Sequence, residues 1–241
     1  MTISVLVPAF NEAAQLPLTL PAIRAAMAAF EARGWATELV VCDNNSTDTT
    51  ASVAAAHGAR VVFEPVNQIG RARNRAASVA IGEWFVFVDA DSKPPVALFA
   101  DIAEAIATGR VLAGGATVTM DDERWWARVG VTAWNTTSRV MRWAAGSCIF
   151  VEAAAFRAVG GFDLTLYASE EIALFRRLKR EARRAGRRIV ILHDHPLHTS
   201  GRKLHLYSWW DMTRFFWRIV TSGGRSLTRP DDCFVWYDGR R

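Results

Sequence analysis

Two aspartates at the end of an apolar run are the residues whose type and spacing best suit chemistry. The stretch Trp84–Val88 predicts a strand buried on both faces, and Asp89-Ala-Asp91 follows it directly. Side chains two apart in extended chain point the same way, so Asp89 and Asp91 face one ligand. Neighbouring carboxylates repel each other, and Mg²⁺ or Mn²⁺ bound to phosphate oxygens is their natural counter-charge. The alternative is an acidic turn after a core strand, and the motif alone does not decide between the two.

The elements that must position these aspartates alternate between strand and helix. Strands are expected at 3–8, 38–42, 59–63 and 84–88, with helices from about 13 to 33, 48 to 57, 70 to 80 and 95 to 108. This alternation predicts a single-domain, three-layer α/β/α sandwich with a mostly parallel, Rossmann-like central sheet.

Three polar clusters fall at strand ends, where ligands of such sheets bind. They are Asn11/Glu12, Asp43–Asp48 and Asp89/Asp91. A core does not require acids at three strand ends, so their coincidence indicates a site.

The second half is less regular. Strands are expected at 111–119, 145–151 and 188–192, and helices at the Trp-rich 125–143, from Ser169 onward, and near 206–221. A loop is expected from His193 to Lys203. Within it Gly201, Arg202 and Lys203 directly follow residues with hydroxyl side chains. A glycine beside hydroxyls and paired cations suits a mobile loop that closes over a diphosphate.

Composition bounds the class of protein. The chain has 241 residues, is 51% hydrophobic and carries a net charge of +5. It shows no signal-peptide pattern and no apolar run of membrane-spanning length, and its three scattered cysteines suggest reduced thiols in a cytoplasm. The positive charge is local: residues 176–188 hold eight Arg or Lys and one acid, Glu181.

Five motifs, in order, resemble those of the family 2 glycosyltransferases, which have the nucleotide-sugar-binding glycosyltransferase-A fold. The resemblance runs from Ile3 to about Lys203. Its motifs are Ser4–Glu12 (SVLVPAFNE), Val41–Asp48 (VCDNNSTD), Asn67–Ala76 (NQIGRARNRA), Asp89–Asp91 (DAD), and Gly160–Asp163 (GGFD) with Glu170-Glu171. The family usually carries Glu-Asp where this chain has Glu170-Glu171.

The resemblance implies roles for individual residues. Glu12 and Asp43 would accept hydrogen bonds from base or ribose, Pro8, Ala9 and Phe10 would form the pocket wall, and Arg73 would lie near base or diphosphate. Asp91 would ligate the metal, with Asp89 contacting ribose or metal. Glu171 would be the catalytic base, with Glu170 beside it shaping the acceptor site. His198 would be a further metal ligand, as a histidine is in some related enzymes, with His193 and His195 as competitors.

On this reading, residues 1–110 bind the nucleotide sugar, 111–205 carry the acceptor and catalytic half, and 206–241 form an aromatic helix and tail. The expected activity is inverting, metal-dependent transfer of a sugar from a UDP- or GDP-linked donor to a hydroxyl of a saccharide or lipid-linked acceptor. One base without a covalent nucleophile implies inversion.

Three other readings stay open. The basic 176–188 segment suits a nucleic-acid-binding protein, but its apolar residues fall on the presumed core side rather than among the cations, so no nucleic-acid partner is expected. A nucleotidyltransferase needs a Gly-rich triphosphate loop after the first strand, and Pro8–Glu12 is not one. Peripheral contact with an anionic membrane, at the inner face of a cytoplasmic membrane, is predicted for Ser208–Val220; the alternative is that its aromatics cover the sheet.

Overall fold

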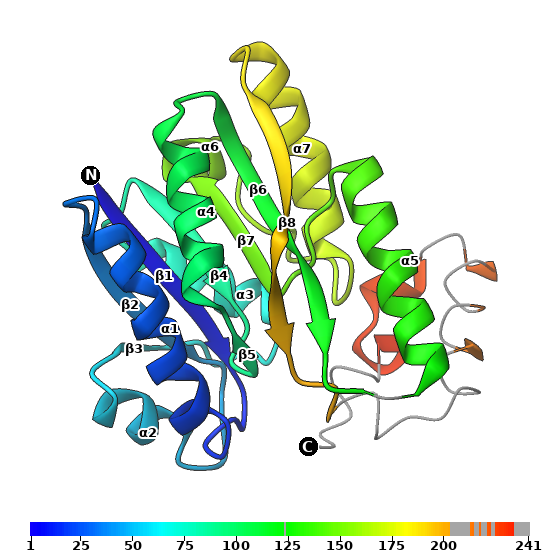
Figure 1. The fold of residues 1–241 in the computed structure, drawn as a ribbon. Coiled ribbons are helices and arrows are strands. Elements are labelled where there is room, and N and C mark those ends of the chain that lie inside the picture. The colour runs from blue at the N-terminus through cyan, green and yellow to red at the C-terminus, as the bar shows by residue number, and fades with distance from the viewer. Residues whose placement is uncertain (123, 203–212, 215–216, 218–220, 223–224, 234–241) are drawn as a thin grey trace.

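The structure is a computed structural model of the chain (Figure 1). The residues it describes are 1–122, 124–202, 213–214, 217, 221–222 and 225–233. The expected aromatic helix near 206–221 and the cation Lys203 therefore lie wholly or largely outside the described residues. Within the described residues, no helix is long and apolar enough to cross a membrane.

Within the described residues, eight strands form one sheet in the order β3-β2-β1-β4-β7-β6-β8-β5. Strands β3, β2, β1 and β4 are parallel, as are β6 and β8, whereas β7 is antiparallel to both of its neighbours and β5 to β8. The mostly parallel α/β sheet expected from the sequence is confirmed. The strands are β1 (Thr2–Ala9), β2 (Ala36–Asp43), β3 (Arg60–Phe63), β4 (Trp84–Val88), β5 (Ser92–Lys93), β6 (Val111–Met120), β7 (Cys148–Glu152) and β8 (Arg188–Thr199).

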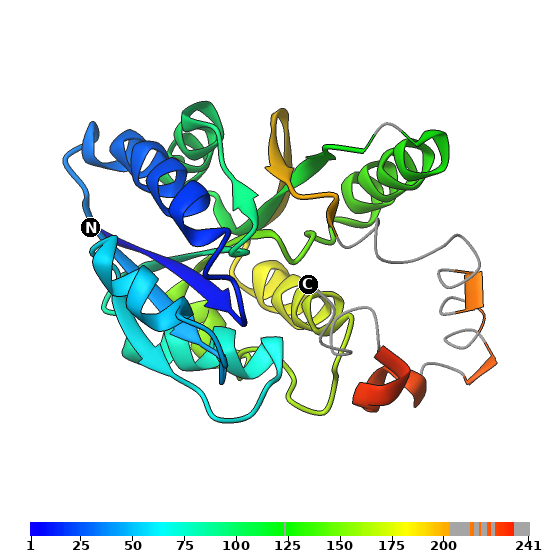
Figure 2. The same ribbon diagram turned by 90° about the horizontal axis from the view of Figure 1, so that it is seen from below.

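Helices cover both faces of the sheet. Alternate side chains of the central strands point to opposite faces, and each face has its own apolar core that helices must cover. In β4, Val86 joins one apolar core and Phe87 the other. The first core is packed by α1, α2, α4 and α5, and the second by α3, α6 and α7; Figure 2 shows α1 (blue) and α7 (yellow) on opposite sides. The helices are α1 (Leu16–Glu31), α2 (Thr50–Ala56), α3 (Ile69–Val79), α4 (Val96–Ala107), α5 (Trp125–Met141), α6 (Ala153–Ala158) and α7 (Glu170–Arg184), followed by the short 3₁₀ turns η1 (Arg225–Thr228) and η2 (Pro230–Cys233).

The end of β8 corrects one expectation. Residues 193–199 are strand rather than loop, with Leu197 and Thr199 buried and paired to β6. The pairing skips from Leu192 to Leu197 on β8 while β6 advances only from Ala116 to Val118. This bulge takes up the polar, proline-containing stretch between them, which is why that stretch has no strand pattern in the sequence.

Candidate active site

The polar clusters that follow β1 and β2 form one hydrogen-bonded unit. Asn11 has a left-handed backbone (φ 52°), its amide N–H donates to Ser46 Oγ (3.0 Å), and its Oδ1 accepts the N–H of Thr47 (2.8 Å). Asp43 is buried at the end of β2, and its Oδ1 accepts the N–H of Ser46 (3.1 Å). The expectation that these strand ends meet is confirmed.

The predicted pocket wall stands at the same edge. Pro8 and Ala9 are buried as the last two residues of β1, where Pro8 pairs with Cys42 of β2, so the strand does not stop at the proline as expected. Phe10 follows and is partly exposed.

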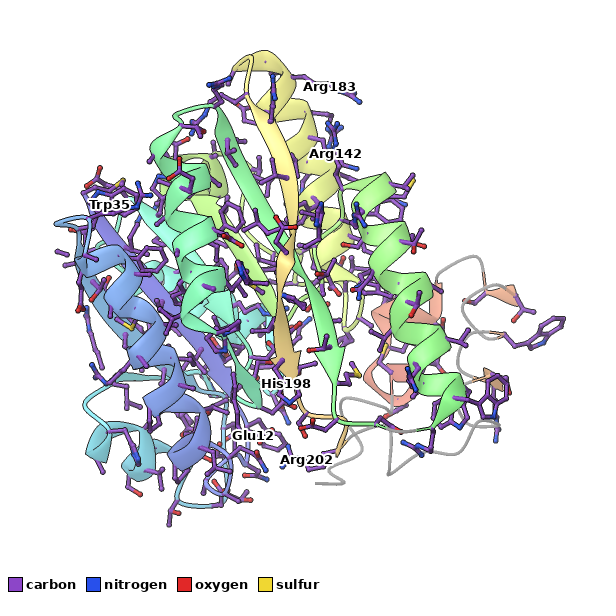
Figure 3. The ribbon with its side chains drawn as sticks, viewed as in Figure 1. Glu12, Trp35, Arg142, Arg183, His198 and Arg202 are labelled. Atoms are coloured by element: carbon purple, nitrogen blue, oxygen red, sulfur yellow. The ribbon has the colours of Figure 1, made fainter. Side chains whose placement is uncertain are left out.

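Glu12 and Arg202 contact each other. Arg202 Nη2 donates to both carboxylate oxygens of Glu12, at 3.0 and 2.9 Å, and the carboxylate is buried. The pair joins the segment after β1 to the segment after β8, 190 residues apart (Figure 3). Two side chains predicted to serve the donor thus neutralise one another in this structure.

The Asp89-Ala-Asp91 turn is held by the end of β8. Ser200 N–H donates to the Asp91 carbonyl (3.2 Å), and Ser92 Oγ donates to Thr199 Oγ1 (3.0 Å) within the β5–β8 pairing. Asp91 itself is partly exposed. This pairing also brings His198 opposite Lys93, two residues beyond Asp91.

The geometry separates the three candidate histidines. His198 lies beside the aspartate turn, with its Nε2 2.8 Å from Asp121 Oδ2. His195 instead pairs with Asp101 (2.8 Å), and His193 with its neighbour Asp194 (3.0 Å). Of the three, His198 is the one that β5 holds next to the Asp89-Ala-Asp91 turn.

The donor set at this turn fits a hard cation that also binds phosphate. Carboxylate and imidazole groups from Asp91, Asp89 and His198 suit Mn²⁺ or Mg²⁺, and Mg²⁺ takes one or two carboxylates and completes its shell with water and substrate phosphates. In the described part of the chain, however, no three His, Cys, Asp or Glu side chains come together as a cluster suited to a metal, so Asp91, Asp89 and His198 do not form a ready three-residue site.

Arg73 connects the two acidic centres from inside the protein. Its Nη1 donates to Glu170 Oε1 (2.8 Å), and its Nη2 donates to Asp89 Oδ1 and to the Gly146 carbonyl, each at 2.9 Å. Its guanidinium stacks over the Phe162 ring at 5.3 Å, and the residue is 1% exposed. In this structure the Nη atoms of Arg73 thus donate to two acids and a backbone carbonyl, and its contact with base or diphosphate stays a prediction.

The two glutamates open α7 and share a buried setting. Burial and the neighbouring Glu171 raise the pKa of Glu170 to about 8, against the lowering effect of Arg73. Burial also raises the pKa of Glu171, whereas Arg73 and a hydrogen bond from Glu170 favour its ionised form. Burial thus raises the pKa of both carboxyl groups, and the Arg73 guanidinium opposes that rise at each of them.

A two-glycine turn sets where α7 begins. Gly160 and Gly161 have φ of 81° and 66°, and a Cβ on Gly161 would come within 2.6 Å of Asn74 Oδ1. Asn74 exchanges hydrogen bonds with the N–H and carbonyl of Phe162 (2.9 Å each), and Arg177 donates to the carbonyls of Val159 and Gly161. The Gly160–Asp163 motif thus positions the acid pair.

Sequence reasoning missed these supporting residues. Gln68 Nε2 donates to the carbonyls of Leu164 and Leu166 (3.0 and 2.8 Å), which ties the start of α3 to the loop before α7. The segment Asn67–Ala76 was recognised as a motif, but only its cations were given roles. The side-chain amides of Gln68 and Asn74 could have indicated this supporting role from the sequence, because each amide can donate and accept hydrogen bonds at the same time.

The comparison with known families covers the part of the chain that precedes the Gly160–Asp163 motif. The family model described as Glycosyl transferase family 2 matches residues 4–159, well over half of the chain. The chain belongs to glycosyl transferase family 2. An uncharacterized glycosyltransferase of Mycobacterium tuberculosis (strain H37Rv) is 34% identical over 141 residues, which are 57% of this chain and 60% of that protein. The match thus spans less than two thirds of that relative's length.

Solved structures show the same fold at low identity. S. aureus TarS 1-349 in complex with UDP-GlcNAc aligns with a TM-score of 0.65 and 20% identity, over 83% of this family 2 chain and 58% of the other. Glucosyl-3-phosphoglycerate synthase from Mycobacterium tuberculosis, in complex with Mn²⁺, UDP and phosphoglyceric acid, aligns with a TM-score of 0.56 and 23% identity, over 82% and 70%. Both support the glycosyltransferase-A fold expected for this chain.

Proposed function

We propose that this family 2 protein transfers a sugar, with inversion, from a nucleoside-diphosphate sugar to an acceptor hydroxyl. The observation that carries the proposal is the continuous path Asp89–Arg73–Glu170, which ends beside Glu171. It holds the Asp89-Ala-Asp91 turn and the Glu170-Glu171 pair in fixed relation, as a displacement between leaving group and acceptor requires.

The chemistry assigned to the chain is one in-line displacement. The acceptor hydroxyl oxygen forms a bond to the anomeric carbon, the bond from that carbon to the β-phosphate oxygen breaks, and the nucleoside diphosphate leaves with the electron pair. Glu171 takes the hydroxyl proton as general base. Glu170 stands beside Glu171 and shapes the acceptor site, while Arg73 holds Glu170 and Asp89 in place.

Mn²⁺ or Mg²⁺, when bound, supplies positive charge to the leaving diphosphate. Asp91 is the proposed principal ligand, with Asp89 and His198 beside it. Asp89 shares its carboxylate with Arg73, so its part is the smaller one. The metal seen with UDP in the glucosyl-3-phosphoglycerate synthase structure supports this assignment.

The donor side is assigned to the edge formed by β1 and β2. Asp43 and Glu12 offer carboxylates to base and ribose, and Pro8, Ala9 and Phe10 wall the pocket. Uridine is the proposed base, since the TarS and synthase structures hold UDP-GlcNAc and UDP. Arg202 and Lys203 remain proposed diphosphate contacts; Arg202 must then leave Glu12 when the donor arrives.

A nucleic-acid-binding role is the weaker candidate. The side chains that α7 buries are Leu174, Phe175 and Leu178, so its exposed cations are not interleaved with aromatics for base stacking.

The experiment that tests the function is a melting-temperature screen of the whole chain against UDP-glucose, UDP-GlcNAc and GDP-mannose, with and without Mn²⁺. Ligands that bind the native state raise the melting temperature with concentration. A UDP-sugar is expected to do so with Mn²⁺ and to release UDP when a hydroxyl acceptor is added. Stabilisation by none of the three donors, with or without metal, would refute the proposal.

A further inference from the structure

We infer that the outer face of α5, with the cations where α5 meets α7, is a docking surface for an anionic lipid bilayer. The inference goes beyond sugar transfer and concerns residues remote from the acidic centres. It rests on an amphipathic helix that leaves an apolar face in solvent, and on positive charge gathered at the end of that face.

The first observation is the pattern of exposure along α5. Trp125, Val129 and Val140 are 73%, 59% and 75% exposed, and Met141 at the end of the helix is 41% exposed. Spacings of four and eleven residues place the first three on one side of a helix. The opposite side packs inward, where Val131 and Trp134 rest on the first core. On this exposed face the large apolar side chains lie at the two ends of the helix, with the small residues Thr132, Ala133 and Thr136 between them.

The second observation is the sign of the charges. Residues 125–143 contain no Asp or Glu, and their cations Arg128, Arg139 and Arg142 are all exposed. An apolar face flanked by cations and without acids is the composition of helices that lie in the headgroup layer, with Trp at the boundary.

The third observation is that α7 adds cations at the end of this face. Arg176 and Lys179 stack over the Trp143 ring at 5.5 and 5.4 Å, and Lys179 Nζ donates to the Met141 carbonyl. Burial and the positive charges of Arg142, Arg183 and Arg176 lower the pKa of Lys179, so these cations repel one another. Figure 3 shows Arg142 and Arg183 on one flank, away from the end that holds Glu12, His198 and Arg202.

The charges favour a bilayer over the other occupants of such a face. In a two-fold dimer the same patch would meet itself, and its cations would find no acid on the partner's α5 to pair with. A nucleic acid would meet the cations but would leave Val129, Val140 and Met141 unused, because aliphatic side chains do not stack on bases. Anionic lipid satisfies both parts, since headgroups pair with the cations while the apolar side chains enter the boundary with the acyl chains.

Flotation of the whole chain with vesicles tests the inference. The chain is expected to float with phosphatidylcholine vesicles that contain phosphatidylglycerol, to stay behind with phosphatidylcholine alone, and to be released by high salt. The test variant combines Val140→Gln with Arg183→Glu. The matched control combines Ile81→Gln with Arg110→Glu; Ile81 is 74% exposed, and both control residues lie outside α5 and α7.

The test variant is expected to partition about tenfold or more weakly than the control, because each cation near an anionic surface and each apolar side chain at the boundary adds to binding. Both variants should keep the melting temperature and UDP-sugar binding of the parent, which separates this outcome from failure of the proposed function. Absence of binding to the anionic vesicles, or equal binding by test and control variants, would overturn the inference. A dimer in light scattering that the test variant converts to monomer would overturn it in favour of self-association.

Discussion

The buried guanidinium of Arg73 allows the most demanding test of the site. Replacing it with methionine keeps much of the side-chain length but removes the positive charge shared by Glu170 and Asp89. Breaking a buried ion pair by deleting one partner costs about 3–5 kcal/mol. The cost here should lie near the lower value, since the Asp89 side chain is 27% exposed and Glu170 can keep its proton. For a chain of this size, about 3 kcal/mol lowers the melting temperature by roughly 6–12 °C.

The matched control is Arg75→Met on the same helix. Arg75 is exposed and donates to the Phe63 carbonyl at 3.3 Å, so its loss should change stability by about 0.5 kcal/mol or less. Denaturant unfolding of the two variants and the parent measures the difference. Adding Glu170→Gln to Arg73→Met should cost less than the two single changes added together, because Glu170 has already lost its Arg73 partner. If Arg73→Met were as stable as Arg75→Met, the buried network would not exist as described.

Three further outcomes follow from the same geometry. Asp91→Asn should abolish metal-dependent turnover with little change in melting temperature, because it alters a partly exposed ligand at a strand end; near-normal metal-dependent activity would remove the metal assignment. Glu171→Gln should lower turnover by roughly 10²–10⁴ while donor binding persists; if only Glu170→Gln did so, the base would be the preceding residue. Stability should fall as pH rises from 4.5 to about 8, because native Glu170 keeps its proton there while the unfolded chain has lost it. A pH titration of unfolding free energy checks this, and stability that rises over the range would contradict the raised pKa.

The strands and helices of the first half were predictable because each of their signals is local. Buried strands read as apolar runs, and polar clusters mark their ends, so Asp43, Asp89 and Asp91 were expected at one edge and lie there. The Trp-rich stretch expected as a helix at 125–143 is α5. Which role each acid plays at that edge stays a prediction.

The features that the sequence did not predict come from contacts between distant parts of the chain. Arg73 was assigned to a ligand because its motif suggested one, but its partner Glu170 is 97 residues away, and no local pattern reports such a pair. The end of β8 was expected as a loop because pairing with β6, and not strand propensity, decides its conformation. The Arg202–Glu12 pair has the same origin, since each residue was considered only as a ligand contact.

The burial of Arg73 also affects when the first half of the chain can pack fully while the protein is made on the ribosome. Residues 1–110 contain all of β1 to β4 and α1 to α4, the parallel part of the sheet. Yet their largest fully buried side chain is that of Arg73, whose partner Glu170 is made much later. Until α7 emerges, this cation has only Asp89 as an acidic partner, so its desolvation costs more than in the complete chain. A nascent chain stalled before residue 170 should therefore present this unfinished surface to chaperones.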